Sequence, residues 1–223
     1  MSRAPGVLVR AVLIALAAMA TTRLAPADTK IVFDRVGALP PDWTSGITGT
    51  GVAKWDVTAE GSAPSSRAVL RQSGEATFCW AVRPNERISD GFAEVKLKPI
   101  AGREDQAGGI IWRFQDANNY YIARANALEG NVVAYKTVNG RRSSLQVKGR
   151  MFGYGVDTDV PKNRWSTLRV DFAGDLFTVS FQGKTLFQVQ DDTFRDAGAV
   201  GLWTKADSVT LFDDFTFGTK SAH

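Results

Sequence analysis

Residues 165–190 read WSTLRVDFAGDLFTVSFQGKTLFQVQ, and this stretch decides the fold class of the chain. Apolar residues take every second position in 168–172 and again in 177–181. Such alternation is typical of strands that bury one face and expose the other. The turns around Gly174 and Gly183 contain residues that tolerate a positive φ, as a tight reversal requires. We therefore predict two consecutive β-hairpins.

The same rhythm continues along the chain, where short β-rich runs recur roughly every 8 to 12 residues. No amphipathic helix of any length interrupts them. The expected strands are Val52–Thr58, Ala68–Gln72, Thr77–Val82, Phe92–Lys98, Gly109–Gln115, Tyr120–Asn126, Val132–Val138, Ser143–Lys148, Trp165–Phe172, Phe177–Gln182, Thr185–Gln190, Val200–Thr204 and Val209–Phe217. Longer loops are expected at 60–66 and 149–163. This number of strands predicts an all-β protein with two packed antiparallel sheets.

The first 27 residues have the pattern of a cleavable secretory signal, with a basic start, an apolar run and small residues before Asp28. The apolar run ends at Ala20 and is too short for the roughly 20 residues that span a bilayer. We predict cleavage before Asp28, with a cut after Ala20 as the alternative. The mature protein is then a single domain over 28–223 that is periplasmic or secreted, without membrane insertion after cleavage.

The charge of the chain argues against a polyanionic partner. The full chain carries a net charge of +4, but Arg3, Arg10 and Arg23 belong to the predicted signal, which contains no acidic residue. The mature protein is therefore close to neutral. Its basic residues form no run longer than the pair Arg141 and Arg142. Nucleic acid is not an expected partner.

Histidine and cysteine are almost absent, which limits the chemistry of the chain. The one histidine is His223, the last residue, and the one cysteine is Cys79. A histidine-based catalytic site and an internal disulfide are excluded, as are zinc, copper and non-haem iron sites of ordinary composition. Any metal must be held by oxygen atoms, so the cofactor prediction is none, or a structural calcium.

Residues 108–126 are unusually rich in Arg, Tyr and Trp. We expect a hairpin here. Strict alternation places Ile110, Trp112 and Phe114 on one face, and Arg113 on the opposite face together with an arginine of the second strand, Arg124. An aromatic ring covers the apolar face of a sugar while a guanidinium reaches its hydroxyls or a carboxylate. The alternative is that the aromatic side chains only pack within the sheet.

The candidate carbohydrate-binding residues are those of this segment and of two later strands. They are Arg113, Tyr121, Arg124, Asn126, Tyr135, Trp203 and Lys205.

The last predicted strand raises the question of a metal. Apolar residues take alternate positions in 209–217, and Asp213 falls among them. A carboxylate that faces a core must be paired, hydrogen-bonded or bound to a cation. One interpretation is a calcium ion held by Asp213 or Asp214 with Asp34; the favoured one is a hydrogen-bonded structural aspartate.

Glycoside hydrolysis ordinarily needs two carboxyl groups that flank the bond. No strand face of this sequence carries a close carboxylate pair. Asp116, at a predicted hairpin tip, and Glu129, in a loop, are the weak catalytic candidates. A pair assembled from two different strands stays open.

Several segments together resemble a known family. They are Gly108-Gly109-Ile110-Ile111-Trp112-Arg113-Phe114, Asn119-Tyr120-Tyr121, Arg124-Ala125-Asn126, Tyr135-Lys136 with Asn139-Gly140-Arg141, Trp165 with Leu168-Arg169-Val170, Gly183 with Leu186-Phe187, and Gly198-Ala199-Val200-Gly201-Leu202-Trp203-Thr204 with Phe212-Asp213-Asp214. Over residues 31 to 217 the chain resembles the concanavalin A-like, laminin-G-like jelly rolls of bacterial secreted proteins, and among them the 3-keto-disaccharide hydrolase domain family.

This resemblance implies a two-sheet antiparallel jelly-roll sandwich of the concanavalin A-like lectin and glucanase type. It also implies a concave face suited to carbohydrate and a hydrolytic activity on 3-keto sugars, but it supplies no catalytic positions. The carboxylate motif of laminarinase-type glucanases is absent from this sequence.

Three hypotheses follow. The leading one is an exported jelly roll that binds a glycan on its concave face. The second is a hydrolase of 3-keto-disaccharides or other 3-keto-glycosides. In it Asp116 or Glu129 would act as a single base, and an arginine would stabilise the enolate. The third is a laminin-G-like structural or adhesion module, which an unbroken apolar surface patch would favour.

Overall fold

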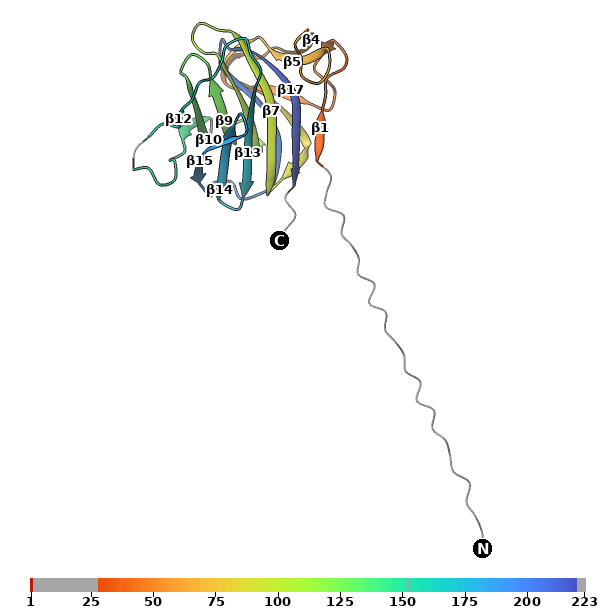
Figure 1. The fold of residues 1–223 in the computed structure, drawn as a ribbon, viewed down its shortest axis with the longest axis vertical. Coiled ribbons are helices and arrows are strands. Elements are labelled where there is room, and N and C mark those ends of the chain that lie inside the picture. Colours follow the sequence, from red (N-terminus) through yellow and green to blue (C-terminus); the bar gives the residue numbers. More distant parts are fainter. Residues whose placement is uncertain (2–27, 152, 220–223) are drawn as a thin grey trace.

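The computed structural model describes residues 1, 28–151 and 153–219, which form two antiparallel β-sheets packed face to face (Figure 1). No α-helix occurs in these ranges, and none of their segments forms a helix long and apolar enough to cross a membrane. The predicted signal, apart from Met1, and the terminal His223 lie outside the described residues. The all-β, two-sheet prediction is confirmed.

The first sheet, sheet A, contains nine of the described strands. They are β1 (Thr29–Ile31), β2 (Gly37–Ala38), β4 (Trp55–Ala59), β5 (Ala68–Gln72), β7 (Gly91–Ala101), β13 (Ser166–Ala173), β14 (Leu176–Phe181), β15 (Lys184–Gln190) and β17 (Val209–Thr219). Their order is β15-β14-β13-β7-β17-β5-β4-β2, and β1 also pairs with β17. The predicted double hairpin is the run β13-β14-β15, with Val170 opposite Val179.

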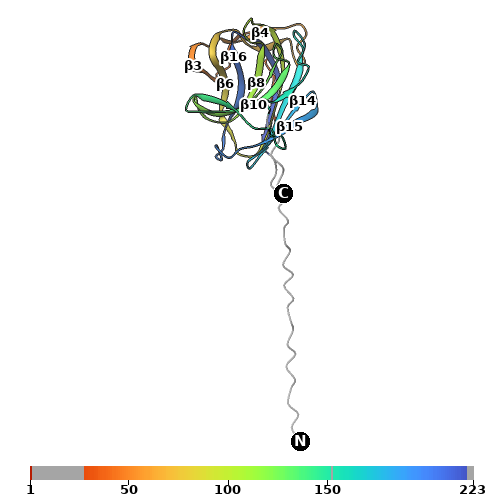
Figure 2. The same ribbon diagram turned by 90° about the vertical axis from the view of Figure 1, so that its left-hand side faces the viewer.

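The second sheet, sheet B, contains eight of the described strands (Figure 2). They are β3 (Thr44–Val52), β6 (Glu75–Ile88), β8 (Ala107–Asp116), β9 (Asn119–Asn126), β10 (Asn131–Val138), β11 (Arg141–Ser144), β12 (Val156–Asp157) and β16 (Gly198–Ala206). Their order is β11-β10-β9-β8-β16-β6-β3, and β12 also pairs with β10.

Strand β3 was not predicted from the sequence. Its residues TSGITGTGV contain three glycines and little apolar alternation, so the expected strand began only at Val52. The strand forms because β6 pairs with it along the edge of sheet B. At Gly46 a Cβ atom would lie 2.4 Å from Cζ2 of Trp80, so the indole ring rests directly on the glycine backbone. Close approach, rather than β propensity, explains this residue.

The space between the sheets is filled by aromatic and aliphatic side chains. Trp112 stacks on Tyr121 with ring centroids 5.3 Å apart, and Phe177 of sheet A lies against both rings. All three side chains are completely buried. Trp112 therefore packs in the core, as the alternative interpretation of this residue held.

A bulge in β8 changes the faces of that strand. Arg113 has a φ of 48°, and the pairing with β9 shifts between Trp112 and Asp116. As a result Ile110 and Trp112 point into the core, whereas Phe114 turns to the outer face of sheet B and packs on Trp80. The prediction that Phe114 shares a face with Trp112 is wrong, because a bulge shifts the alternation by one residue.

A second bulge, in β17, moves Asp213 out of the core. Asp214 has a φ of 51°, and Phe212 rather than Leu211 belongs to the core cluster. Asp213 is fully buried beneath the loop at 60–66, where its oxygens accept hydrogen bonds from the backbone nitrogen of Ser65 at 2.9 Å and the hydroxyl of Ser65 at 2.5 Å. The predicted core-facing position of Asp213 is wrong, and its hydrogen-bonded state is confirmed.

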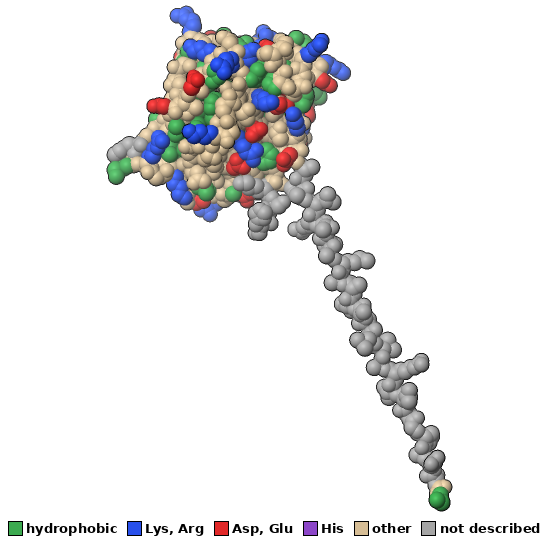
Figure 3. Space-filling model, viewed as in Figure 1, with side chains coloured by type: hydrophobic (Ala, Val, Ile, Leu, Met, Phe, Trp, Pro, Cys, Tyr) green, Lys and Arg blue, Asp and Glu red, His purple; other side chains and the backbone are tan. Residues whose placement is uncertain are grey.

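The charged residues of sheet A pair with one another. Arg71 lies 2.6 Å from Asp56, and Arg169 lies 2.8 Å from Asp171. Figure 3 accordingly shows basic and acidic side chains interspersed on the visible side of the molecule, without a large area of one sign.

Candidate functional site

The outer face of sheet B carries a second aromatic cluster, separate from the core. Phe78, Trp80, Tyr120, Tyr135 and Trp203 belong to it, and each is at most 8% exposed. These side chains come from four strands of sheet B, β6, β9, β10 and β16, at positions that alternate with core residues. Buried aromatic side chains therefore pack on both sides of the sheet.

Arg124 of β9 lies beside this cluster, is 1% exposed, and uses most of its donors. Its Nη2 atom lies 2.7 Å from Glu129 Oε2, 3.0 Å from the hydroxyl of Tyr135 and 3.2 Å from the hydroxyl of Tyr154. Nη1 donates to Asn131 Oδ1. The tight turn from β9 to β10 brings Glu129 and Asn131 back to the arginine.

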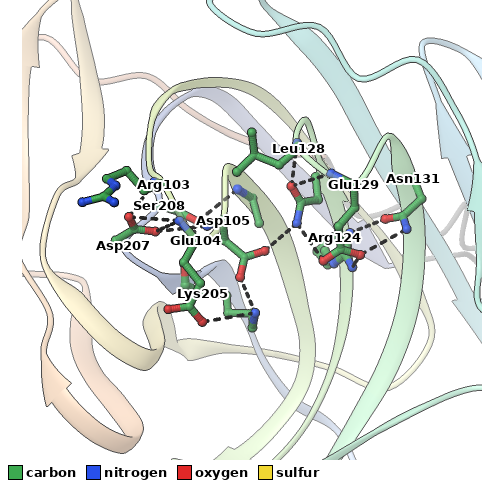
Figure 4. Close-up of polar contacts among 12 residues, drawn as sticks. Arg103, Glu104, Asp105, Arg124, Leu128, Glu129, Asn131, Lys205, Asp207 and Ser208 are labelled. Atoms are coloured by element: carbon green, nitrogen blue, oxygen red, sulfur yellow. Dashed lines mark hydrogen bonds and ion pairs between the residues drawn. The ribbon is translucent and has the colours of Figure 1, made fainter.

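A chain of polar contacts continues from this arginine toward β16 (Figure 4). Nδ2 of Asn126 donates both to Glu129 Oε1 at 3.0 Å and to Asp105 Oδ1 at 2.5 Å, so the two carboxylates share one donor. Lys205 of β16 forms an ion pair with Asp105. We call these eight residues the Arg124 network: Asp105, Arg124, Asn126, Glu129, Asn131, Tyr135, Tyr154 and Lys205.

The loop that holds Asp105 is fixed by Asp207. Its carboxylate accepts hydrogen bonds from the backbone nitrogens of Arg103 at 2.6 Å, and of Glu104 and Asp105 at 3.0 Å each. Burial raises the pKa of Asp207, but these backbone donors outweigh that effect, so the net shift is downward. The ionised carboxylate thereby holds the loop between β7 and β8 in place.

The charges of Arg124 and Glu129 reinforce each other. Burial raises the pKa of Glu129, but the charge and hydrogen bond of Arg124 lower it by more, so the carboxyl titrates below its ordinary value. Burial lowers the pKa of Arg124, and Tyr135 and Glu129 raise it above its ordinary value. Both groups are therefore charged at neutral pH.

Tyr154 is the part of the network most open to solvent. It lies between β11 and β12, is 47% exposed, and bonds to the hydroxyl of Tyr135. Gly155 follows with a φ of 62°, and a Cβ atom there would lie 2.3 Å from the carbonyl oxygen of Val132. Only glycine lets the segment approach β10 this closely, and this approach holds Tyr154 over the network.

The structure brings together four of the seven predicted carbohydrate-binding residues, Arg124, Asn126, Tyr135 and Lys205, and it adds the catalytic candidate Glu129. The sequence interpretation missed Asp105, Asn131 and Tyr154. Asp105 lies in the loop between β7 and β8, yet it is only 1% exposed.

Arg113 and Tyr121 lie elsewhere. Arg113 donates to the backbone carbonyl oxygens of Ser89 at 2.9 Å and Gly174 at 2.7 Å. The hydroxyl of Tyr121 donates to Asp191 Oδ1 at 2.7 Å, and its ring lies in the core. The prediction that Arg113 and Arg124 share a polar face is wrong, because the bulge at Arg113 directs its side chain to the loops instead.

Trp203 and Asp116 are separate from the network. Trp203 lies on the outer face of sheet B but is completely buried against Phe78, with ring centroids 5.4 Å apart. Asp116 lies at the β8–β9 turn, where it accepts a hydrogen bond from the backbone nitrogen of Asn118 at 2.7 Å. It also accepts from the side-chain amide of Asn119 at 3.0 Å, and it acts as a turn residue.

The three predicted calcium ligands do not converge. Asp213 is bound by Ser65, whereas Asp214 pairs with Lys30 and Lys96 at 2.7 Å each. Within the described residues, no three His, Cys, Asp or Glu side chains are grouped so that they could hold a metal ion. Asp34 follows β1 and lines a depression together with Trp43. Calcium binding stays a prediction.

No family model and no curated protein matches the chain, but solved structures do. The carbohydrate-binding module CBM66 from Bacillus subtilis has a TM-score of 0.63 at 20% identity, over 85% of this chain and 100% of that one. The cellulose-induced protein Cip1 has a TM-score of 0.56 at 11% identity, over 81% and 93%. The carbohydrate recognition domain of Emp47p has a TM-score of 0.51 at 15% identity, over 82% and 91%. These similarities show the fold: the chain is a two-sheet antiparallel jelly roll.

Proposed function

We propose that this chain is an exported protein that binds a carbohydrate over the Arg124 network, on the outer face of sheet B. The observation that supports this most is the position of Tyr154. Its half-exposed side chain lies on a hydrogen-bonded set of charged and neutral polar groups whose central arginine, Arg124, is buried. Export rests on the predicted signal, and periplasmic or secreted localisation follows from it.

The chemistry of the network suits a sugar. Glu129, whose side chain is 38% exposed, offers carboxylate oxygens, and Lys205, 26% exposed, offers ammonium donors. Tyr154 adds an aromatic ring that can cover the apolar face of a pyranose. Sites of this kind combine an apolar wall with a few fixed polar groups. Because Arg124, Asn126 and Asn131 already hold Glu129, little ordering is needed when a ligand binds.

Two of the similar structures have names that agree with this proposal, the carbohydrate-binding module CBM66 and the carbohydrate recognition domain of Emp47p. The similarity in fold lends the proposal support but identifies no ligand.

The second candidate is hydrolysis of a 3-keto-glycoside, the activity that the resemblance to the 3-keto-disaccharide hydrolase domain family implies. Glu129 and Asp105 share the Nδ2 atom of Asn126, so a carboxylate pair does exist. A general acid, however, needs a raised pKa, and the pKa of Glu129 is lowered. Glu129 therefore suits the role of a base in the elimination of a 3-keto sugar better than that of an acid. Binding is favoured over cleavage.

The third candidate, a structural or adhesion module, would need a broad apolar surface. The large apolar side chains that are exposed in the described residues include Val32, Val36, Val52, Leu128 and Met151, which come from four separate segments. Scattered apolar residues of this kind are normal on a monomer.

The test is a glycan array probed with the mature protein, followed by calorimetric titration of the best ligand. Tyr154→Ala is expected to weaken binding roughly tenfold through loss of the ring contact. Met151→Ala is the matched control, because Met151 lies in the same segment and is exposed without joining the network. Absence of binding to every glycan would contradict the proposal. Turnover of a 3-keto-glucoside that Glu129→Gln abolishes would establish the second candidate instead.

A further inference from the structure

Arg142 lies against the aromatic cluster of sheet B without a charged partner. It belongs to β11, opposite Thr137 of β10. Its guanidinium carbon lies 4.2 Å from the ring centroid of Tyr135, 4.8 Å from that of Phe78 and 5.6 Å from that of Trp203. Three rings therefore fix the guanidinium by cation–π contacts.

Three other cations of sheet B are neutralised. Arg124 pairs with Glu129 at 2.7 Å, Lys136 pairs with Asp191 at 2.6 Å, and Lys205 pairs with Asp105. Arg142, in contrast, makes no ion pair or hydrogen bond in the part of the chain that the structure describes, and its Nη1 atom is buried without a partner. The side chain as a whole is only partly buried, so solvent reaches it.

The unpartnered Nη1 atom of Arg142 calls for an explanation, because buried polar groups in folded proteins are almost always satisfied. On a side chain that solvent reaches, it indicates a place where a ligand completes the hydrogen bonding.

We propose that Arg142 recognises the carboxylate of an acidic saccharide, a hexuronate unit, bound on the outer face of sheet B. This inference rests on the proposed function and specifies its substrate class. The cation–π contacts do not use the N–H groups of the guanidinium as hydrogen-bond donors, so those that solvent reaches stay available to a ligand. A planar fork of N–H donors matches a carboxylate, which accepts two parallel hydrogen bonds. A neutral hydroxyl would leave the positive charge uncompensated.

The neighbouring rings fit the rest of the sugar. Tyr154 is exposed and contacts Tyr135, with the two ring centroids 5.9 Å apart. Tyr135 thus contacts both the guanidinium of Arg142 and the ring of Tyr154. A pyranose on Tyr154 could direct its carboxylate toward Arg142 while its hydroxyls reach Glu129.

The experiment compares oligosaccharides of glucose, galactose and mannose with the corresponding oligouronates and their methyl esters, by calorimetric titration of the mature protein. At least one oligouronate should bind roughly 10- to 100-fold more tightly than its neutral and esterified counterparts, the range for a hydrogen bond to a charged group. The preference should decrease with salt. Arg142→Met should remove it, and Arg142→Lys should retain part of it.

Arg141→Met is the matched control, because Arg141 precedes Arg142 on the same strand and is exposed. It should leave the preference unchanged. Melting temperatures establish that each variant is folded. If Arg142→Met does not fold, the binding of Arg142→Lys and the salt dependence of the wild type test whether Arg142 recognises the carboxylate. Equal or tighter binding of the neutral sugars would overturn the assignment but not the proposed function. Absence of binding to all of these saccharides would overturn the assignment, and absence of binding to every glycan of the array would overturn both.

Discussion

Arg124 Nη2 lies 2.7 Å from Glu129 Oε2, in an ion pair whose cation is 1% exposed and whose carboxylate is 38% exposed. A guanidinium stays protonated throughout the pH range in which proteins fold. Arg124 therefore depends on Glu129 for its counter-charge, while Glu129 keeps one side open to a ligand. Glu129 thus both stabilises the fold and faces the proposed sugar.

Replacing Glu129 by Gln should lower the free energy of unfolding by about 1 kcal/mol at neutral pH, less than for a fully buried pair because Glu129 is partly exposed. The effect should depend on pH. The folded-state pKa of Glu129 lies below its ordinary value, so the stabilisation is present above that ordinary value and is lost as the pH falls through the folded-state pKa. Urea denaturation of both proteins at pH 7 and in acid measures this.

Glu104→Gln provides the comparison, since Glu104 is 70% exposed and lies 3.9 Å from Lys205. A surface pair of this kind contributes little, about 0.5 kcal/mol or less. An equal decrease in the free energy of unfolding of both variants would show that Arg124 does not need Glu129 as its counter-charge.

Lys205→Met should destabilise the protein more strongly, by about 3 kcal/mol, because it leaves the carboxylate of Asp105 buried without a cation. Only 2% of the Asp105 side chain is exposed. Asp105→Asn in the Lys205→Met background should restore part of the loss, since a neutral amide needs no counter-charge and can still accept from Asn126. Together with the wild type and Asp105→Asn alone, these two variants form a double-mutant cycle. Additive effects would contradict a direct ion pair.

Hydrophobic alternation predicted the strands whose two faces meet different surroundings. Strands β13, β14 and β15 are examples, and their bounds differ from the expected ones by at most one residue. Alternation failed at Arg113 and Asp214, where a positive φ in a non-glycine residue inserts a bulge. The residue types at these positions do not predict a bulge, because the bulge arises from the pairing of each strand with its neighbours.

The candidate site was predictable only where it lies on strands. Arg124, Asn126 and Tyr135 follow from the density of sugar-binding residue types on two paired strands. Asp105 and Tyr154 lie in loops, and a loop has no sequence periodicity from which the positions of its side chains could be predicted. Their positions depend on long-range contacts such as that of Asp207 with the loop of Asp105.

Removal of calcium should leave the melting temperature unchanged. The carboxylate of Asp213 is occupied by Ser65, and that of Asp214 by Lys30 and Lys96. Thermal denaturation in EDTA and in excess calcium tests this. A rise in melting temperature with calcium that Asp213→Asn abolishes would establish the predicted calcium site and require a rearrangement of the Ser65 loop.

Asp191 connects the two sheets, because it follows β15 of sheet A and binds two residues of sheet B. Its carboxylate lies 2.6 Å from the ammonium of Lys136 and accepts a hydrogen bond from the hydroxyl of Tyr121 at 2.7 Å. Burial raises the pKa of Asp191, but hydrogen bonds from Lys136, Thr193 and Tyr121 outweigh this, so the net shift is downward.

Asp191→Asn should therefore lower the free energy of unfolding by about 2 kcal/mol at neutral pH, since it leaves Lys136 unpaired. The stabilisation is present above the ordinary pKa of an aspartate and is lost as the pH falls through the lower folded-state value. Denaturation curves of wild type and variant should consequently converge in acid. Asp192→Asn is the matched control, because Asp192 is 63% exposed and pairs only with the exposed Arg195. A difference between wild type and Asp191→Asn that persists undiminished below the folded-state pKa would show that packing, rather than charge, holds the sheets together here.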